Sequence, residues 1–315
     1  MENTESNVSN LDRVRINFYR LIKLDFIKSN ARWIKALKTF WDYYFVRLGI
    51  KKQCVIKFRD GESMQFSNDK LKDLLDMRTI NGFKKRGFTV EKLKKGFLVI
   101  LNDVKLKIND LSELSVIAEN FIKGQYNWLD TKNKQVVDIG ANIGDTAVYF
   151  SKIKEAKKVI AFEPYPYAFN LAKKNVSINK LKNVVLRNQG VGDKNKFVFI
   201  KADFINTGGS DLKIFNKGKR IQIVTLEDIV KKYNIKEGVL KMDCEGCEYS
   251  IILNADNAVL RRFNQIMVEC HYGYKNIEKK LKDAGFNVFH SKVHYSYNKS
   301  ADDPKMFVNL IEAKL

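Results

Sequence analysis

The sequence contains few prolines and cysteines, and it has no long apolar run. Its 3 prolines and 45% hydrophobic residues suit a globular chain with a real core. Its 4 cysteines are too few for a disulfide framework in 315 residues, so we expect reduced thiols and a cytoplasmic protein. No stretch approaches the ~20 consecutive apolar residues of a membrane-spanning helix. The polar start MENTESNVSN lacks the pattern of a secretory signal.

The chain is strongly basic, with a formal net charge of +21. Such a charge could indicate RNA, an anionic membrane surface or a phosphorylated substrate. Of the 57 basic residues, however, 45 are Lys and only 12 are Arg. We therefore favour dispersed lysines that reflect a compositional bias and keep the protein soluble.

The pattern of apolar residues divides the chain near residue 110. Residues 1–110 form an expected accessory region, with amphipathic helices within 11–52 and a β-rich part over 53–110. The β-rich part carries Asp60-Gly61 and Asn102-Asp103 between alternating runs, which is typical of hairpins. Residues 111–315 are expected to form the main domain.

The second accessory helix carries an apolar stripe. Residues 11–52 hold 11 basic and 3 acidic residues, a net charge of +8. The stripe could lie on an anionic membrane or pack against the rest of the protein, and we favour packing with weak membrane association at most. Its members follow helical spacing: Trp33, Ile34, Leu37, Phe40, Trp41, Tyr44, Phe45 and Leu48.

From about residue 111, apolar runs of strand length alternate with helical stretches. This alternation predicts an α/β fold with a mostly parallel sheet and helices on both faces. The last strand is expected to be an antiparallel strand at the edge. The predicted strands are 136–139, 158–162, 184–188, 239–243, 265–269, 286–289 and 307–313.

A glycine-rich turn, DIGANIGDT, follows the first of these strands. Asp138 ends the strand, and Gly140 and Gly144 allow the backbone to turn and to approach a ligand. A dinucleotide fingerprint needs a middle glycine, which Asn142 replaces here, so a nucleoside ligand without a pyrophosphate fits better. Glu163 ends the second strand, where an acid can accept both hydroxyl protons of a ribose.

Four segments in this order resemble the FkbM family of class I methyltransferases: DIGANIGDT, FEP, TLEDI and KMDCEG. The resemblance covers residues 136–271, under half of the chain. It implies a Rossmann-like fold, S-adenosylmethionine as cofactor, and usually O-methylation of a sugar, glycan or small-molecule hydroxyl. It does not identify the acceptor.

The class I pattern also implies further cofactor contacts. It places Asp138 and Gly140 beneath the methionine part of the cofactor, and Asn188 and Gly190 beside the adenine. Asp193 either acts there or is an ordinary turn acid. Tyr126 could close over the methionine end, but a buried core tyrosine is the favoured interpretation.

Four side chains at the ends of adjacent strands are candidates for the catalytic base: Asp243, Glu245, Glu269 and His271. An alcohol is only weakly acidic, so a base, a metal or tight positioning must help the transfer. His is the residue that titrates near neutral pH. A divalent ion held by Asp243 and Glu269 is the less favoured alternative.

Cys244 and Cys247 form a C-x-x-C motif, with Cys270 later in the chain. A structural zinc needs four ligands, and Cys54 is too remote in sequence to be an evident fourth. We therefore expect these cysteines to fill small apolar sites.

Three other functions remain open. An RNA methyltransferase is suggested by the charge, although no recognised RNA-binding module is present. A non-catalytic basic protein at a membrane would leave the cofactor motifs without a purpose. A nicotinamide dehydrogenase is disfavoured by the missing glycine. The sequence does not indicate an oligomeric state.

Overall fold

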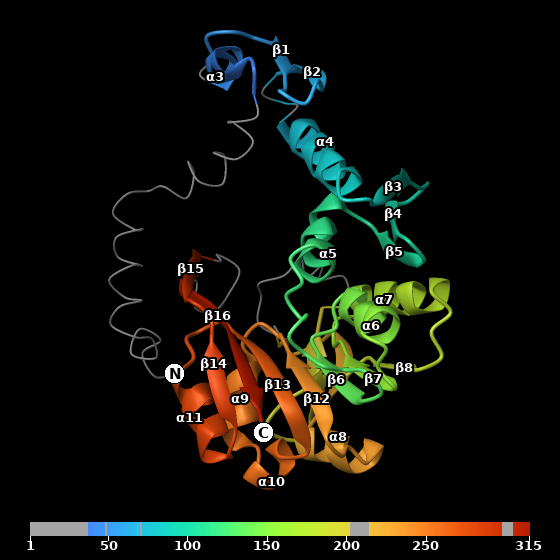
Figure 1. Ribbon diagram of the computed structural model, residues 1–315, viewed down its shortest axis with the longest axis vertical. Coiled ribbons are helices and arrows are strands. Elements are labelled where there is room, and N and C mark those ends of the chain that lie inside the picture. Colours follow the sequence, from blue (N-terminus) through green and yellow to red (C-terminus); the bar gives the residue numbers. More distant parts are fainter. Residues whose placement is uncertain (1–36, 48, 68, 70, 202–213, 298–304) are drawn as a thin grey trace. The chain divides into compact units, whose positions relative to one another are not determined.

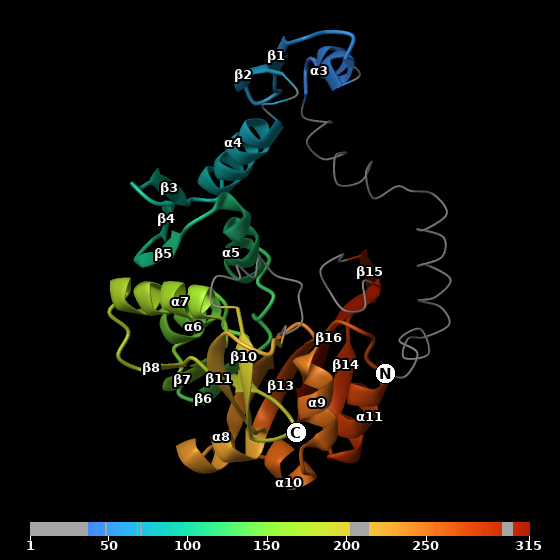
Figure 2. The ribbon, with the colours of Figure 1, turned by 180° about the vertical axis from the view of Figure 1, so that it is seen from behind.

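The structure, a computed structural model, describes residues 37–47, 49–67, 69, 71–201, 214–297 and 305–315. These residues belong to two compact units, one within 14–90 and the other within 91–315. Figures 1 and 2 show the chain from opposite sides. The division expected at residue 110 falls inside the second unit. The assignment of residues 1–110 as an accessory region and 111–315 as the main domain stays a prediction.

The first unit is built around a β-hairpin. Strands β1 (Cys54–Lys57) and β2 (Ser63–Phe66) pair antiparallel across the predicted Asp60-Gly61 turn. Helices α3 (Phe40–Arg47) and α4 (Leu71–Lys84) complete the described part. Its small core consists of Leu37, Tyr43, Val46, Ile56, Phe58, Phe66 and Leu74.

The core of the first unit buries only part of the predicted apolar stripe: Leu37 belongs to it and Phe40 packs against it. Tyr43 and Val46 point into the core, whereas Trp41 is 66% exposed and Tyr44 is 43% exposed. The expectation of a packed stripe is therefore wrong for Trp41 and Tyr44, because α3 turns Tyr43 and Val46 toward the core and leaves these two rings exposed. Trp33 and the first predicted helix lie outside the described residues. The predicted membrane association stays a prediction.

The second unit centres on a large sheet whose strand order is β14-β16-β13-β12-β6-β7-β8. Strands β13, β12, β6, β7 and β8 run parallel. The chain moves from β6 outward through β7 and β8, then crosses to β12 on the other side of β6. The order thus reverses at β6, and ligands bind at such a reversal in open α/β sheets. The bounds are β6 Gln135–Ile139, β7 Lys158–Phe162, β8 Val184–Arg187, β12 Gly238–Met242, β13 Phe263–Cys270, β14 Asn287–His290 and β16 Lys305–Lys314.

The C-terminal strand β16 is antiparallel, as predicted, but it is not at the edge. It pairs with β13 on one side and with β14 on the other. The short β15 (His294–Tyr297) pairs with β16 as well. β16 is 10 residues long and largely buried where its side chains are described, whereas β14 has 4 residues and three exposed side chains. The longer apolar strand therefore takes the inner position.

Two apolar cores lie on the two faces of the sheet. Alternate residues of one strand point to opposite faces, and Val137 and Ile139 belong to one core while Val136 belongs to the other. The first core includes α8 (Leu226–Tyr233), α9 (Cys247–Asn254), α10 (Asn257–Leu260) and α11 (Lys275–Asp283). The second includes α6 (Asp145–Val148) and the following π-helical turn Tyr149–Ile153.

The remaining elements flank the sheet. α5 (Leu114–Phe121) follows a short 3₁₀ turn, Leu111–Glu113, and α7 (Pro166–Ile178) follows β7. β4 (Phe97–Leu101) and β5 (Val104–Ile108) form the predicted hairpin around Asn102-Asp103, and β3 (Thr89–Lys92) precedes them. A three-stranded sheet has the order β10-β11-β9, with bounds Lys196–Ile200, Lys219–Val224 and Gly190–Val191. Within the described residues, no helix is long and apolar enough to cross a membrane.

The different burial of Ile56 and Trp41 predicts that their substitution by alanine destabilises the fold to different extents. Ile56 is fully buried, so Ile56→Ala should lower the free energy of unfolding by about 2–5 kcal/mol. Trp41→Ala, on the exposed side of the same unit, should change it by about 0.5 kcal/mol or less. Urea denaturation followed by circular dichroism measures both, and a large loss in the Trp41 variant would contradict the exposed position of that ring.

Candidate functional site

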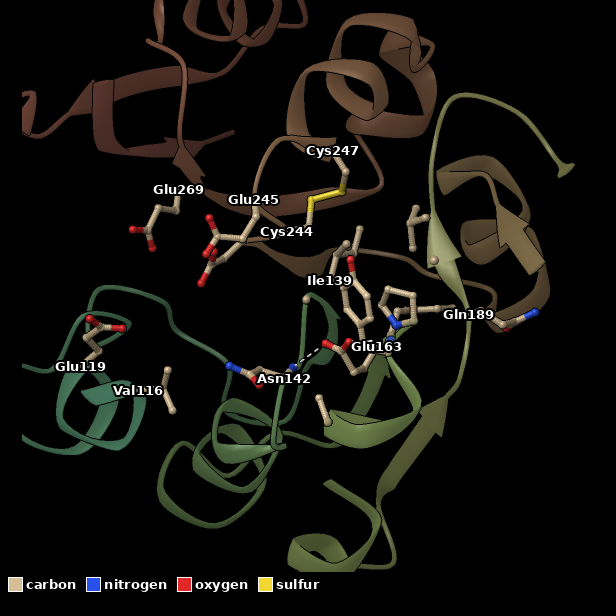
Figure 3. Close-up of a pocket in the computed structure, with 18 of the residues that line it drawn as sticks. Val116, Glu119, Ile139, Asn142, Glu163, Gln189, Cys244, Glu245, Cys247 and Glu269 are labelled. Atoms are coloured by element: carbon tan, nitrogen blue, oxygen red, sulfur yellow. Dashed lines mark hydrogen bonds between the residues drawn. A yellow bond between two sulfur atoms is a disulfide. The ribbon is translucent and has the colours of Figure 1, made fainter. Parts of the chain in front are cut away.

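A cavity of about 290 Å³ opens at the carboxyl ends of β6, β7, β12 and β13, where the strand order reverses. Residues from α5 and β9 complete its wall (Figure 3). Seven of the predicted site residues line it: Gly140, Asn142, Glu163, Gly190, Asp243, Glu245 and Glu269. Five others do not: Asp138, Gly144, Asn188, Asp193 and His271.

The glycine-rich turn is shaped mainly by contacts with other parts of the protein. A Cβ atom at Gly140 would lie 1.8 Å from the backbone oxygen of Asp243, so only glycine allows β6 and β12 to converge here. A Cβ atom at Gly144 would lie 2.9 Å from two atoms of Ala172 in α7. We expected these glycines to approach a ligand. Gly144 makes room for α7 and does not line the cavity, whereas Gly140 makes room for the neighbouring strand and lines the cavity, so its approach to a ligand stays a prediction.

Glu163 is held in a fixed position by the backbone around it. Its Oε2 accepts the N–H of Asn142 at 2.9 Å, and its Oε1 accepts the N–H of Tyr165 at 2.8 Å. Burial raises its pKa to about 7, although both hydrogen bonds act in the opposite direction. Each carboxylate oxygen keeps a further acceptor position. The side chain can therefore accept two more hydrogen bonds from a ligand in the cavity.

Asp138 lies beneath the cavity in a buried ion pair. Its Oδ1 is 3.2 Å from Nζ of Lys241, and its Oδ2 accepts a hydrogen bond from Thr146 at 2.6 Å. Lys241 also donates to the carbonyl oxygen of Gly140 at 2.8 Å. Burial alone would lower the pKa of Lys241, but the carboxylates of Asp138 and Asp243 outweigh it and raise that pKa. Asp138 is thus a support of the turn and does not line the cavity.

One side of the cavity is a wall of carboxylates. Figure 3 shows Glu119, Glu245 and Glu269 gathered there, with Glu163 and Gln189 farther along the cavity. Burial, with the charge of Glu269 second, raises the pKa of Asp243 well above its usual range. Burial also raises the pKa of Glu269, which accepts a hydrogen bond from Gln125 at 2.9 Å. Carboxyl groups with raised pKa values are stronger bases than exposed ones once they ionise.

His271 is buried behind this wall, between two carboxylates. Its Nδ1 lies 3.1 Å from Oε1 of Glu248, and its Nε2 lies 3.1 Å from Oε2 of Glu245. Burial alone would lower its pKa, but Glu248 and Glu245 raise it well above the usual value. Both ring nitrogens lie beside a carboxylate oxygen, so neither is free to accept a substrate proton. The geometry favours the carboxylates over His271 as the base.

Asp243, Glu248 and His271 approach one another closely enough to hold a metal ion, with one ligand atom from each within 4.8 Å of the others. The hydrogen bonds favour a different interpretation. Glu248 also accepts the N–H groups of Cys244 at 2.9 Å and Gly246 at 2.7 Å. Together with His271, these groups use three acceptor positions of Glu248, so we describe the group as a network of ion pairs. A divalent ion between Asp243 and Glu269 stays the less favoured prediction.

The other predicted residues have structural contacts. Asn188 donates to the carbonyl oxygens of Glu163 at 2.9 Å and Pro164 at 2.8 Å, and so braces the loop that carries Glu163. Asp193 is exposed and lies 4.0 Å from Lys196, as expected of a turn acid. Tyr126 is a buried core residue, which was the favoured interpretation.

The sequence analysis missed three residues in or beside the site. Glu119 belongs to α5 and reaches the cavity from a segment far from the motifs. Asp145 is buried and accepts a hydrogen bond from Asn120, and burial raises its pKa to about 7. Lys241 stands in the KMDCEG motif, where a lysine inside an otherwise apolar strand could have indicated a buried ion pair.

The cysteines differ from the expectation. Cys244 and Cys247 form a disulfide, with their Cα atoms 5.5 Å apart, whereas reduced apolar fillers were predicted. The loop between them starts helix α9, and this turn brings the two side chains within bonding distance. Cys54 and the buried Cys270 are free thiols.

Loss of the buried lysine should destabilise the fold. Lys241→Met leaves Asp138 charged without its partner, and breaking a buried ion pair costs about 3–5 kcal/mol. The exposed pair Lys279–Asp283 provides a control, since Lys279→Met should change the free energy of unfolding little. Denaturant titration of both variants tests this, and equal stabilities would contradict the supporting role of Lys241.

The raised pKa values of two buried acids predict that the protein becomes less stable as the pH rises toward 7. Glu163 and Asp145 have usual pKa values of 4.5 and 3.8, and both are raised to about 7 in the folded chain. Between these values the folded chain keeps protons that the unfolded chain releases. The free energy of unfolding should therefore fall as pH rises toward 7, by at most about 1.4 kcal/mol per pH unit for each group.

Urea titrations between pH 5 and pH 8 measure this slope. Glu163→Gln should reduce the slope, whereas Asp193→Asn, at an exposed turn, should not. A stability that rises over the same interval in the wild type, with no difference in the Glu163 variant, would contradict the raised pKa of Glu163.

Comparison with known proteins agrees with this geometry. Residues 138–288 match a family model described as the methyltransferase FkbM domain. A Methanocaldococcus jannaschii protein named "Putative protein N5-glutamine methyltransferase" is 34% identical over 84 residues, which cover 27% of this chain and 41% of that protein. The chain thus matches less than half of that relative's length.

Two further proteins show lower similarity. The methyltransferase sdnD of Sordaria araneosa is 22% identical over 201 residues, covering 52% of this chain and 78% of that protein. The solved FkbM methyltransferase of Methylobacillus flagellatus is 12% identical, covers 78% of this chain and 61% of its own, and has a TM-score of 0.40. The family match runs from within β6 to within β14 and includes the cavity residues of four strands, so this part of the chain matches the methyltransferase domain of the FkbM family.

Proposed function

We propose that this protein transfers a methyl group from S-adenosylmethionine to a hydroxyl group of a sugar, glycan or other small molecule. The observation that carries the proposal is Glu163, a buried carboxylate with two free acceptor positions at the end of β7, in the cavity of an FkbM domain.

The cofactor would lie with its ribose at Glu163. Hydroxyl groups of a ribose can donate one hydrogen bond to each carboxylate oxygen. The backbone at Gly140 and Asn142 lies at the same end of the cavity, and Gln189, Gly190 and Val191 border the space beyond. The methionine end then extends toward the carboxylate wall of Glu119, Glu245 and Glu269.

S-adenosylmethionine, when bound, supplies a methyl group on a positively charged sulfonium sulfur. The carboxylates of Asp243, Glu245 and Glu269 stabilise a positive charge beside them. The bound cofactor would supply its methyl group to an acceptor hydroxyl held at this end of the cavity, and its thioether would be the leaving group. Asp243 or Glu269 takes the hydroxyl proton, since both line the cavity and burial raises the pKa of both.

The charge of the cavity supports a neutral acceptor over RNA. Five carboxylates line it, namely Glu119, Glu163, Asp243, Glu245 and Glu269. Among the described residues, no Lys, Arg or His lines it. A phosphate group would find no cationic side chain among these residues, while RNA binding relies on Lys and Arg beside phosphates. The basic residues that give the net charge of +21 therefore lie outside the described lining of the cavity.

Glu163 provides the direct test. Glu163→Ala should weaken the binding of S-adenosylhomocysteine by at least about tenfold, because each charge-assisted hydrogen bond contributes about 1.5–3 kcal/mol. Isothermal titration calorimetry on folded protein measures the affinity.

The matched control is Asp193→Ala, which removes an exposed carboxylate outside the cavity and should leave the affinity unchanged. Unchanged binding in the folded Glu163 variant would contradict the assigned ribose contact. Saturable binding of NAD with no binding of S-adenosylhomocysteine would instead support a dehydrogenase.

A further inference from the structure

The disulfide Cys244–Cys247 forms part of the wall of the cavity (Figure 3). Both cysteines are half-buried and both line the cavity, so a small thiol can reach them through the cofactor site. Methyl transfer from a sulfonium to an oxygen needs no thiol and no disulfide. The proposed function therefore leaves this bond without a role.

The disulfide closes the loop that positions the acidic residues. Glu245 lies between the two cysteines with φ of 58°, and Gly246 has φ of 119°. Positive φ at a residue other than glycine is uncommon and persists only where surrounding contacts hold it. Glu248 provides two of those contacts, since it accepts the N–H groups of Cys244 and Gly246. The disulfide provides a covalent third.

Movement of this loop would change the cavity in two places. Glu245 lines the cavity directly, and its Oε2 lies 3.1 Å from His271. Asp243, which comes just before Cys244, lines it as well and sits against Gly140 through its backbone oxygen. The state of the disulfide is thus coupled to the carboxylate wall and to the turn beneath the cofactor.

We propose that Cys244 and Cys247 are a redox-active pair that exchanges with thiols of the glutathione class and thereby sets the affinity of the cofactor site. The inference rests on the proposed function. In the disulfide state the loop is held and the site binds its cofactor well. In the dithiol state the loop gains freedom, and binding must order it again at a cost in affinity.

Atoms and electrons balance in this thiol–disulfide exchange without any further reactant. An external thiolate attacks one sulfur of the pair, forms a mixed disulfide and releases the other cysteine, which takes up a proton. A second external thiolate attacks the mixed disulfide and leaves two protein thiols and one external disulfide. The protein gains two electrons and two protons, which the two external thiols lose. The reverse reaction needs only the external disulfide.

The position of the pair favours such exchange. Cys247 is the first residue of the 8-residue helix α9. A C-x-x-C pair at a helix N-terminus is an arrangement typical of thiol–disulfide exchange, in which a thiolate is the attacking group. The other described cysteines differ. Burial raises the pKa of the Cys270 thiol well above its usual range, and burial raises that of Cys54 as well.

The experiment compares the full chain in its two redox states. One sample is equilibrated with oxidised glutathione and one with dithiothreitol, and alkylation with iodoacetamide followed by mass spectrometry counts the free thiols of each. Calorimetry with S-adenosylhomocysteine then measures affinity. We expect the oxidised sample to bind at least about fivefold more tightly, the lower end of typical coupling between two sites.

If the redox state changes ligand affinity, the ligand must change the reduction potential of the disulfide by the same free energy, which gives a second measurement. If the disulfide state binds S-adenosylhomocysteine about fivefold more tightly, saturating ligand must make the disulfide harder to reduce, by about 20 mV for a two-electron couple. Titration of the wild type against glutathione buffers, with and without ligand, measures this shift.

Two variants separate the pair from other effects. The double variant Cys244→Ser/Cys247→Ser should bind like the reduced protein and ignore the redox buffer. Cys54→Ser, outside the cavity, should keep the full response. Equal affinities of the oxidised and reduced wild type would overturn this inference and leave the methyltransferase proposal intact. The same holds if alkylation finds Cys244 and Cys247 free in oxidised glutathione. Binding by neither state would overturn the proposed function and the coupling together.

Discussion

The buried ion pair between Lys241 and Asp138 determines how the two halves of the sheet meet at the site. Lys241 extends from β12 to Asp138 on β6 and to the carbonyl oxygen of Gly140. It thereby fixes the turn after β6 against the end of β12, where the strand order reverses. A buried charge without a partner is strongly unfavourable, so each member of this pair requires the other. The cavity above it depends on that arrangement.

The same lysine makes an acidic cavity possible. Asp138, Asp145 and Asp243 all lie close enough to Lys241 to affect its pKa. Its positive charge offsets part of the repulsion among carboxylates that burial brings together. The remaining negative charge faces the cavity through Asp243, Glu245 and Glu269. A protein with a net charge of +21 can therefore present a site that attracts a sulfonium cation and repels a phosphate.

The loop after β12 combines rigidity with chemical reactivity. It holds Asp243 and Glu245 at the cavity, and it contains the cysteine pair. Glu248 binds the loop backbone through two N–H groups and neutralises His271 at the same time. A residue that looks like a possible base in the sequence thus has both ring nitrogens engaged, and the acids next to it are the candidate bases of the proposed reaction. The proposed redox exchange of the cysteine pair would act on those same acids.

The sequence by itself determined the parallel strands and the motif positions, because the spacing of apolar residues and glycines is a local property. It placed Glu163 correctly at the cavity, since the end of a parallel strand has a predictable location. Only the tertiary structure decided that Asp138 points beneath the cavity, that Trp41 is exposed, and that β16 lies inside the sheet. It also brought Glu119 from α5 to the carboxylate wall. These outcomes depend on which segments pack together, and contacts between residues far apart in the chain have no local pattern that sequence reasoning can detect.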